Sequence, residues 1–321
     1  MSPAVVTETV DALLSQGINL KRVYLITTAH EDILSRCIPL VENEFSKNYN
    51  RRGVKLHPYD SLLAKDDIYT EEDNLELMLL AGNLFKREKG SDIYVSMAGG
   101  RKTMSAAMAV LAQIYGARAI THVLVSPELE KKGNVKILQG LKEEEREEVM
   151  HPRDTRLIFF PVIGITWMLD EMVNFLGETG RPEVQAEVRG ILQANGLLDE
   201  QAHPTGLGKQ LYRLINDIEK FPPPALEETP STKFKKDEGP HAPKGFYKFV
   251  STLTLVPFVK KIVGKAYKNS PETKINQYEG EGQFNCQYSD GVKAYVFLII
   301  TTARTDGEAG MVRRFLEKHF K

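Results

Sequence analysis

The stretch of residues 92–115 constrains the fold most strongly, because it joins a short apolar segment to a helix through two adjacent glycines. Residues 92–95 predict a buried strand, and residues 103–115 carry large apolar side chains at helical spacing among many alanines. A glycine turn between a strand and a helix is typical of α/β sheets, in which ligands bind at the carboxyl ends of the strands. We therefore expect a ligand site at this turn.

The chemistry of the turn predicts an anion as the ligand. Gly99 and Gly100 allow close approach to the backbone, and the following helix presents unpaired N–H groups and the positive end of its dipole. Arg101 and Lys102 add positive charge, which favours phosphate. The turn is not a P-loop, since Lys102 does not directly follow a glycine. A tight turn with a solvated Lys/Arg pair stays open as the alternative.

The first 150 residues alternate between apolar strands and amphipathic helices, which predicts a mostly parallel sheet in a three-layer α/β fold. Residues 2–3, 27–28 and 98–102 then fall at the carboxyl edge of the sheet. An edge strand is predicted at residues 135–138. The expected strands are 23–26, 54–56, 93–95 and 120–125, and the expected helices are 5–14, 31–45, 71–85 and 103–115.

Charge is distributed unevenly along the 321 residues, which are enough for two or three domains. The net charge of −1 combines +7 in residues 231–321 with −8 in the preceding 230, so the C-terminal end is expected to face nucleic acid, unless its lysines only solubilise the surface. Two distant cysteines exclude a disulfide framework and a zinc cluster. No signal peptide is visible and the longest apolar run is too short to cross a membrane, so we expect a cytoplasmic protein.

The remaining chain divides into three segments. Residues 151–221 contain a helix, short strand, turn and helix order typical of a winged helix, although a helical hairpin between domains is the plainer alternative. Residues 222–244 are rich in Pro, Lys, Glu and Thr and predict a linker. Residues 246–267 predict two helices separated at Pro257, followed by strands at 273–278, 283–288 and 293–301 and a last helix capped by Asp306.

Residues 1–150 resemble a CARF domain, the Rossmann-like sensor of cyclic oligoadenylates in type III CRISPR systems. Residues 2–9, Thr27–Thr28 and residues 96–105 carry the resemblance. It implies a homodimer that clasps one cyclic tetra- or hexa-adenylate across its two-fold axis. The implied ligand-binding residues are Ser2, Pro3, Thr28, Ala98, Gly99, Gly100, Arg101, Lys102 and Thr103.

Some relatives also cleave the ring, and the resemblance implies Ser2 and Lys102 for that reaction. The strand that precedes this first loop in the family is absent here, so either the true start lies upstream or the sheet lacks a strand.

Residues 245–321 resemble a RelE-type mRNA interferase in the order of their elements and in Thr301-Thr302-Ala303-Arg304 after the core strand. The resemblance implies a metal-independent attack of the RNA 2′-hydroxyl on the adjacent phosphate. Arg304 and Lys274 match catalytic positions of the family, Lys265 and Lys268 offer further cations, and Tyr288 or His319 would carry protons. Two family positions differ: Gln283 or Asn285 stands in place of a later arginine, and Gly310 in place of a tyrosine.

Together these segments resemble CARF–RelE effectors, the CRISPR-Cas-associated mRNA interferases. The expected architecture is a CARF sensor (1–150), a winged-helix dimerisation unit (151–221), a linker (222–244) and a small α+β RelE-like ribonuclease (245–321). Cyclic tetra- or hexa-adenylate is then the activator, with no other cofactor, and the partners are mRNA, the ribosome and its stalk protein. The alternatives are a CARF–winged-helix regulator, a ring nuclease alone, and a HEPN ribonuclease based on Arg314 and His319.

Overall fold

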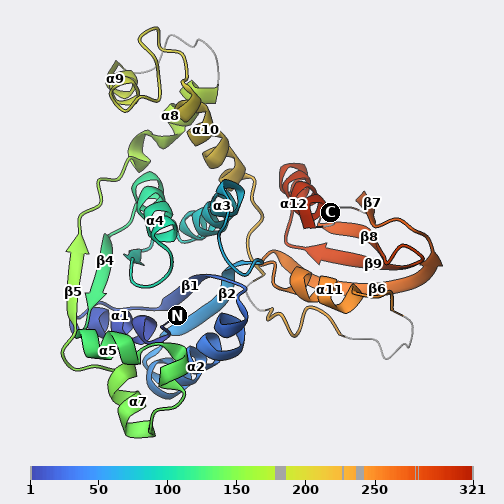
Figure 1. Ribbon diagram of the computed structural model, residues 1–321. Helices are drawn as coiled ribbons and strands as arrows, with labels where there is room; N and C mark the ends of the chain where they lie inside the picture. The colour runs from blue at the N-terminus through green and yellow to red at the C-terminus, as the bar shows by residue number, and fades with distance from the viewer. Residues whose placement is uncertain are drawn as a thin grey trace.

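The computed structural model describes residues 2–177, 186–225, 228–235, 242–278, 280 and 282–319. Figure 1 shows an N-terminal α/β body, a helical extension that rises from it, and a C-terminal unit beside the body. Among the described residues, no helix combines the length and the apolar character needed to cross a membrane.

The strands of the body form two sheets rather than one. β1 (Arg22–Thr28) pairs in parallel with β2 (Lys55–Leu63), and β3 (Tyr94–Ser96) pairs in parallel with β4 (Ala119–Leu124). β5 (Arg156–Phe160) is antiparallel to β4 and completes the order β3-β4-β5. The predicted α/β class with parallel strands is confirmed, but β1 and β3 do not pair with each other in the described residues.

Helices lie on both sides of these strands. α1 (Ala4–Ser15) contacts β4 and β5, whereas α3 (Glu71–Arg87) and α4 (Lys102–Tyr115) pack against each other above the strands (Figure 1). The start of α3 is fixed by a capping box, because Thr70 accepts a hydrogen bond from the Asp73 amide and Asp73 accepts one from the Thr70 amide.

Short helical segments connect the strands. The predicted edge strand at residues 135–138 is wrong: these residues form α6 (Val135–Leu138). The side-chain oxygen of Asn134 accepts a hydrogen bond from the Lys136 amide and caps this helix. The other short segments are a π-helical turn (Ile33–Cys37), α2 (Ile38–Glu44), a second π-helical turn (Phe45–Tyr49), a 3₁₀-helical turn (Asn50–Arg52), α5 (Pro127–Lys132) and α7 (Glu143–Met150).

His151 ties α7 to the rest of the body. Its Nδ1 lies 2.7 Å from Asp11 Oδ2 and its Nε2 lies 3.3 Å from Glu44 Oε2, while the Tyr49 hydroxyl donates to Asp11 at 2.7 Å. Burial alone would lower the pKa of His151, but the hydrogen bonds and charges of the two carboxylates outweigh burial and raise it. The side chain of His151, which faces Asp11 and Glu44, therefore links α7 to α1 and α2.

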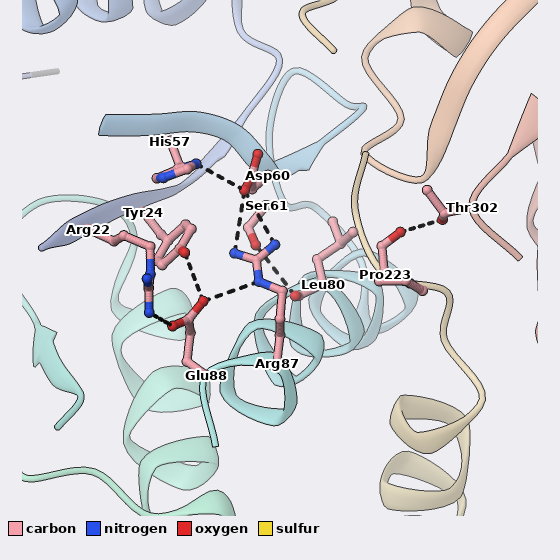
Figure 2. Close-up of polar contacts among 10 residues, drawn as sticks. All are labelled: Arg22, Tyr24, His57, Asp60, Ser61, Leu80, Arg87, Glu88, Pro223 and Thr302. Carbon is pink, nitrogen blue, oxygen red and sulfur yellow. Dashed lines mark hydrogen bonds and ion pairs between the residues drawn. The ribbon is translucent and has the colours of Figure 1, made fainter. Parts of the chain in front are cut away.

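A second polar network joins β1, β2 and α3 at the starting end of β1 (Figure 2). Glu88 accepts from Arg22 at 2.5 Å and from the Tyr24 hydroxyl at 2.8 Å. Arg87 bridges Glu88 at 3.3 Å and Asp60 at 3.4 Å, and its guanidinium lies 4.7 Å from the centre of the Tyr24 ring. These contacts hold α3 across both strands at the end of the sheet opposite Thr28.

The extension comprises a 3₁₀ turn (Thr166–Met168), α8 (Leu169–Gly177), α9 (Ala186–Ala194) and α10 (Gly206–Glu219). Between α9 and α10 a single antiparallel bridge joins Leu198 to Pro204. The two helices match the predicted helix, turn and helix order, while a winged helix with a paired wing stays a prediction.

The C-terminal unit packs α11 (Phe246–Thr254) and α12 (Asp306–His319) with an antiparallel sheet of order β6-β9-β8-β7. The predicted second helix before residue 267 is wrong, since that segment is a strand that pairs along its length with β9. The cap of α12 also differs, because Thr305 rather than Asp306 accepts from the Glu308 amide. The strands are β6 (Val259–Asn269), β7 (Lys274–Tyr278), β8 (Gln283–Ser289) and β9 (Lys293–Thr301).

One hydrophobic core joins the body to the C-terminal unit, since Leu77 and Leu80 of α3 belong to the same buried cluster as Phe258 and Phe297. The described part of the predicted linker packs into this junction. Lys233 is 1% exposed, its ammonium group donates to the Val256 carbonyl, and its own carbonyl accepts from the Ile262 amide. The segment therefore lies against β6 rather than in solvent.

Candidate functional site

The candidate site lies where β1 and β3 end. Thr28 closes β1, and its hydroxyl donates to the Asp66 carbonyl at 2.9 Å. The next amide, of Ala29, is held by the Leu63 carbonyl at 2.9 Å. Thr28 is 6% exposed, so it positions the loop after β2 and does not itself face solvent.

The glycine turn adopts the backbone that the sequence predicts. Gly99 and Gly100 have φ values of 81° and 74°, a region that side chains with a β-carbon rarely occupy. A β-carbon on Gly99 would also approach Val5 of α1 to 3.2 Å. α4 begins directly afterwards at Lys102, so its first N–H groups, which lack intrahelical partners, emerge at the turn.

The two cations of the turn differ in their surroundings. Arg101 donates from Nε to Asp67 Oδ1 at 2.6 Å and from its terminal nitrogen to Asp67 Oδ2, and this bond lowers the pKa of Asp67. The Arg101 guanidinium also lies 5.9 Å from the centre of the Tyr69 ring. Lys102 and Thr103 are exposed, and within the described residues no carboxylate pairs with Lys102. Lys102 is thus the cation that is free to meet an anion.

The start of α1 lies beside the glycine turn, near Gly99. Pro3 occupies the N-cap of α1 without a side-chain hydrogen bond, and Ser2 Oγ lies so near α5 that a β-carbon on Gly133 would be 2.7 Å away. Further along α1, the hydroxyls of Thr9 and Ser96 lie 3.3 Å apart. This face of α1 therefore packs against the strand that leads into the glycine turn.

Glu8 is a buried carboxyl on α1. It is 3% exposed, and burial, assisted by the negative charge of Glu130, raises its pKa from 4.5 to about 7. In the described part of the chain the structure gives its carboxyl no hydrogen-bond partner. Glu8 therefore keeps its proton to a higher pH than an exposed glutamate does.

The predicted residues lie at one edge of the body. Side chains that the sequence did not predict for the site connect them. The Asp66–Asp67 dipeptide connects Thr28 to Arg101, and Val5 and Thr9 connect α1 to the turn. No hydrogen bond joins Ser2 to Lys102 within the described residues. The adjacent Asp66 and Asp67 are a sequence signal for a partner of Arg101. No local sequence signal predicts the contact between Thr9 and Ser96.

The C-terminal candidates lie on one sheet and the loop after it. Lys265 on β6 donates to Asn285 of β8 at 2.7 Å, and Lys274 on β7 pairs with Glu272 at 2.8 Å. Lys268 is exposed on β6, and Arg304 is exposed just after β9. Within the described residues, no carboxylate pairs with the Arg304 guanidinium.

Of the two proton carriers proposed from the sequence, Tyr288 and His319, the structure describes the side chain of Tyr288. The Tyr288 hydroxyl donates to the Lys244 carbonyl at 3.0 Å, and its ring stacks on Phe249 with centroids 4.8 Å apart. Tyr288 thus has a structural partner for its only proton. The side chain of His319 lies outside the described residues. The strands of this unit also do not match the all-helical HEPN alternative.

One group of side chains among the described residues has the spacing of metal ligands. Glu44, Glu147 and His151 each offer an atom within 4.8 Å of the others. The cluster lies under α7 and contains none of the predicted site residues. Both nitrogens of His151 already lie within hydrogen-bond distance of carboxylates, those of Asp11 and Glu44.

Comparison with known proteins identifies the family. Residues 2–193 match the family described as CRISPR-associated protein NE0113, and this match covers more than half of the chain. A relative is the CRISPR system ring nuclease SSO2081 of Saccharolobus solfataricus, which is 26% identical over 134 residues. The aligned region covers 40% of this chain and 70% of that protein. The chain belongs to the CRISPR-associated NE0113 family.

Proposed function

We propose that this family member is an accessory effector of type III CRISPR defence. In this proposal residues 1–150 bind cyclic tetra- or hexa-adenylate, residues 151–221 contribute to a homodimer and transmit the signal, and residues 245–321 cleave mRNA on the ribosome. The observation that carries the proposal is the glycine turn, where two left-handed glycines and the start of α4 converge on Lys102, which has no carboxylate partner among the described residues.

The proposed ligand matches the chemistry of this edge. A cyclic oligoadenylate presents several phosphates on one ring, and each phosphate can accept hydrogen bonds from amides at the start of α4 and charge from Lys102. The Arg101–Asp67 pair holds the turn in place and leaves Lys102 as the main source of positive charge. A ring-shaped polyanion would therefore bind through its phosphates, with strong dependence on salt.

The proposed ribonuclease reaction uses the cations of the C-terminal unit. The RNA 2′-oxygen attacks the adjacent phosphorus, the bond to the 5′-oxygen breaks, and a cyclic phosphate and a 5′-hydroxyl result. Arg304, Lys265, Lys268 and Lys274 would stabilise the charge that develops on the phosphorane oxygens. The exposed guanidinium of Arg304, which pairs with no carboxylate in the described part of the chain, favours it as the first of these. Tyr288 would need to exchange its hydrogen bond to Lys244 before it could transfer a proton.

Cleavage of the ring itself is a second candidate activity, favoured by the similarity to a protein named as a ring nuclease. Ser2 and Lys102 would act in it, with Ser2 orienting the attacking 2′-hydroxyl and Lys102 neutralising the phosphate. Because no hydrogen bond joins the two side chains in the described residues, ring binding would have to bring them to the same phosphate.

Titration of the full-length protein with cyclic tetra- and hexa-adenylate tests the sensor assignment. Lys102→Ala should weaken binding by about 10-fold or more, the loss expected for one charge-assisted contact. Lys89→Ala is the matched control, because Lys89 is also exposed but follows α3 near the opposite end of the sheet. Equal affinities for wild type and Lys102→Ala would overturn the assignment.

A further inference from the structure

Asp67 holds Arg101 at the place where a ligand phosphate would bind it. The carboxylate accepts hydrogen bonds from Nε and from a terminal nitrogen of the guanidinium, and this fork of donors also fits a phosphate. The pair is open to solvent, since the side chains of Arg101 and Asp67 are 52% and 28% exposed. An ion pair this exposed stabilises the free protein only slightly, so a phosphate can compete with Asp67 for Arg101.

The loop that carries Asp67 is bound to the end of β1 through its backbone. The Ala29 amide donates to the carbonyls of Leu63 and Lys65, at 2.9 and 2.6 Å, and the Thr28 hydroxyl donates to the Asp66 carbonyl. Residues 63–67 are therefore attached to β1 by their carbonyls and to the glycine turn by the Asp67 carboxylate. A change at either contact would act on the same short segment.

The apolar side chains of this loop belong to the core that joins the body to the C-terminal unit. Leu63, Ala64 and Ile68 are at most 7% exposed, and they share one buried cluster with Val312 and Leu316 of α12. Figure 1 shows α12 on the side of the C-terminal unit that faces α3. The loop is thus in contact with the candidate sensor site through its polar groups and with the junction through its apolar ones.

An ionic network adds a second connection across the junction. Lys65 pairs with Asp73, and its Nζ lies 3.4 Å from Oε2 of Glu76 on α3. Glu76 is 6% exposed, and burial raises its pKa, while the positive charges of Lys65 and of Lys318 in the last turn of α12 act in the opposite direction. The charge of Lys318 therefore acts on the same carboxylate as the lysine of the loop.

The other end of α12 holds Arg304, the first candidate for the ribonuclease reaction. Glu308 in the first turn of α12 accepts from the amides of Arg304 and Thr305, at 2.6 and 3.2 Å. The helix thus fixes the backbone that carries the Arg304 guanidinium. Packed cores change between discrete arrangements, so a shift of residues 63–68 would reach α12 as a change of packing.

We propose that Asp67 is a latch between the sensor site and the ribonuclease unit. In the free protein it holds Arg101 and keeps residues 63–68 in place. When a ligand phosphate takes over Arg101, the loop is released and α12 repacks together with Arg304. The inference rests on the proposed function and deepens it, because it names a route for the signal that leads through residues 63–68 rather than through residues 151–221.

Hydrogen exchange of the full-length protein without any ring tests the latch. Asp67→Asn removes the charge that holds Arg101 but can keep the hydrogen bond from the Ile68 amide. The amides of residues 64–69 and of α12 should therefore exchange about 3- to 5-fold faster, the change in population that an exposed ion pair allows. Asp66→Asn is the matched control, because it removes the same charge from the next residue, whose carboxylate lies 3.5 Å from the Tyr69 hydroxyl and does not pair with Arg101.

Calorimetric titration with cyclic tetra- and hexa-adenylate gives the second readout. Asp67→Asn should bind the ring about 3- to 5-fold more tightly than Asp66→Asn, because a phosphate no longer competes with a carboxylate for Arg101. In wild type, the ring should change the exchange of α12 in the same direction as Asp67→Asn does.

Three results would overturn the latch: equal exchange in the two variants, faster exchange at residues 64–69 without any change in α12, or equal ring affinities. A wild type that binds neither ring would overturn the sensor assignment instead. The comparison of the two variants without a ring would then still decide whether Asp67 is coupled to α12.

Discussion

The burial of Glu8 predicts a pH dependence of the free energy of unfolding. Its carboxyl is 3% exposed and its pKa rises from 4.5 to about 7 on folding. A folded-state pKa above the unfolded value means that the proton stabilises the fold below pH 4.5, and that this stability is lost as pH rises through 7. The full loss is on the order of 3 kcal/mol above pH 8. Glu8→Gln, which cannot ionise, should escape it.

We therefore expect Glu8→Gln to match wild type near pH 4.5 and to exceed it in unfolding free energy by on the order of 3 kcal/mol at pH 8. Urea unfolding monitored by circular dichroism at both pH values measures the difference. Glu144→Gln is the control, because Glu144 is exposed on α7 and its substitution should change stability by less than about 0.5 kcal/mol. A stability difference for Glu8→Gln that is independent of pH would refute the reasoning.

Three further predictions concern other parts of the molecule. The pKa of His151 is raised on folding, so its ion pairs stabilise the fold below the unfolded pKa of 6.5, and this stabilisation is lost as pH rises through the folded pKa. His151→Gln should therefore lower the free energy of unfolding by about 2 kcal/mol at pH 6 and by clearly less at pH 9, as measured by urea unfolding. Gly264→Ala would place a β-carbon against the Tyr295 hydroxyl and should destabilise the C-terminal unit by about 1–3 kcal/mol, whereas Gly190→Ala, which meets nothing within 4 Å, should not lower the thermal midpoint. Arg304→Ala should slow mRNA cleavage by about 100-fold, measured by primer extension.

Local sequence signals predicted the elements on which the candidate site depends. The glycine pair at 99 and 100, followed by a helix rich in alanine, has few alternatives to a strand, turn and helix unit, and the structure has this unit. Those signals are short-range, because they arise from the backbone preferences of glycine and from helical periodicity. They predicted the position of Lys102. They did not predict the ion pair between Arg101 and Asp67, because it joins residues 34 positions apart in the sequence.

The two predictions that the structure overturns, at residues 259–269 and 135–138, fail for other physical reasons. In residues 259–269 apolar positions at 259, 262, 263 and 266 have helical spacing, yet pairing with β9 makes the segment a strand. Partner strands distant in sequence decide such segments, since their hydrogen bonds outweigh local helix propensity. At residues 135–138 two local signals compete, because Asn134 caps a helix whereas Val135 and Ile137 favour a strand, and the helix forms.

The most direct test of the proposed function is mRNA cleavage in a translating extract, with and without cyclic tetra- or hexa-adenylate. The account predicts cleavage by the full-length protein only when a ring is present, and its loss in both Lys102→Ala and Arg304→Ala. Intact mRNA with every ring, from a protein that still binds or degrades the ring, would contradict it and leave a regulator or a ring nuclease.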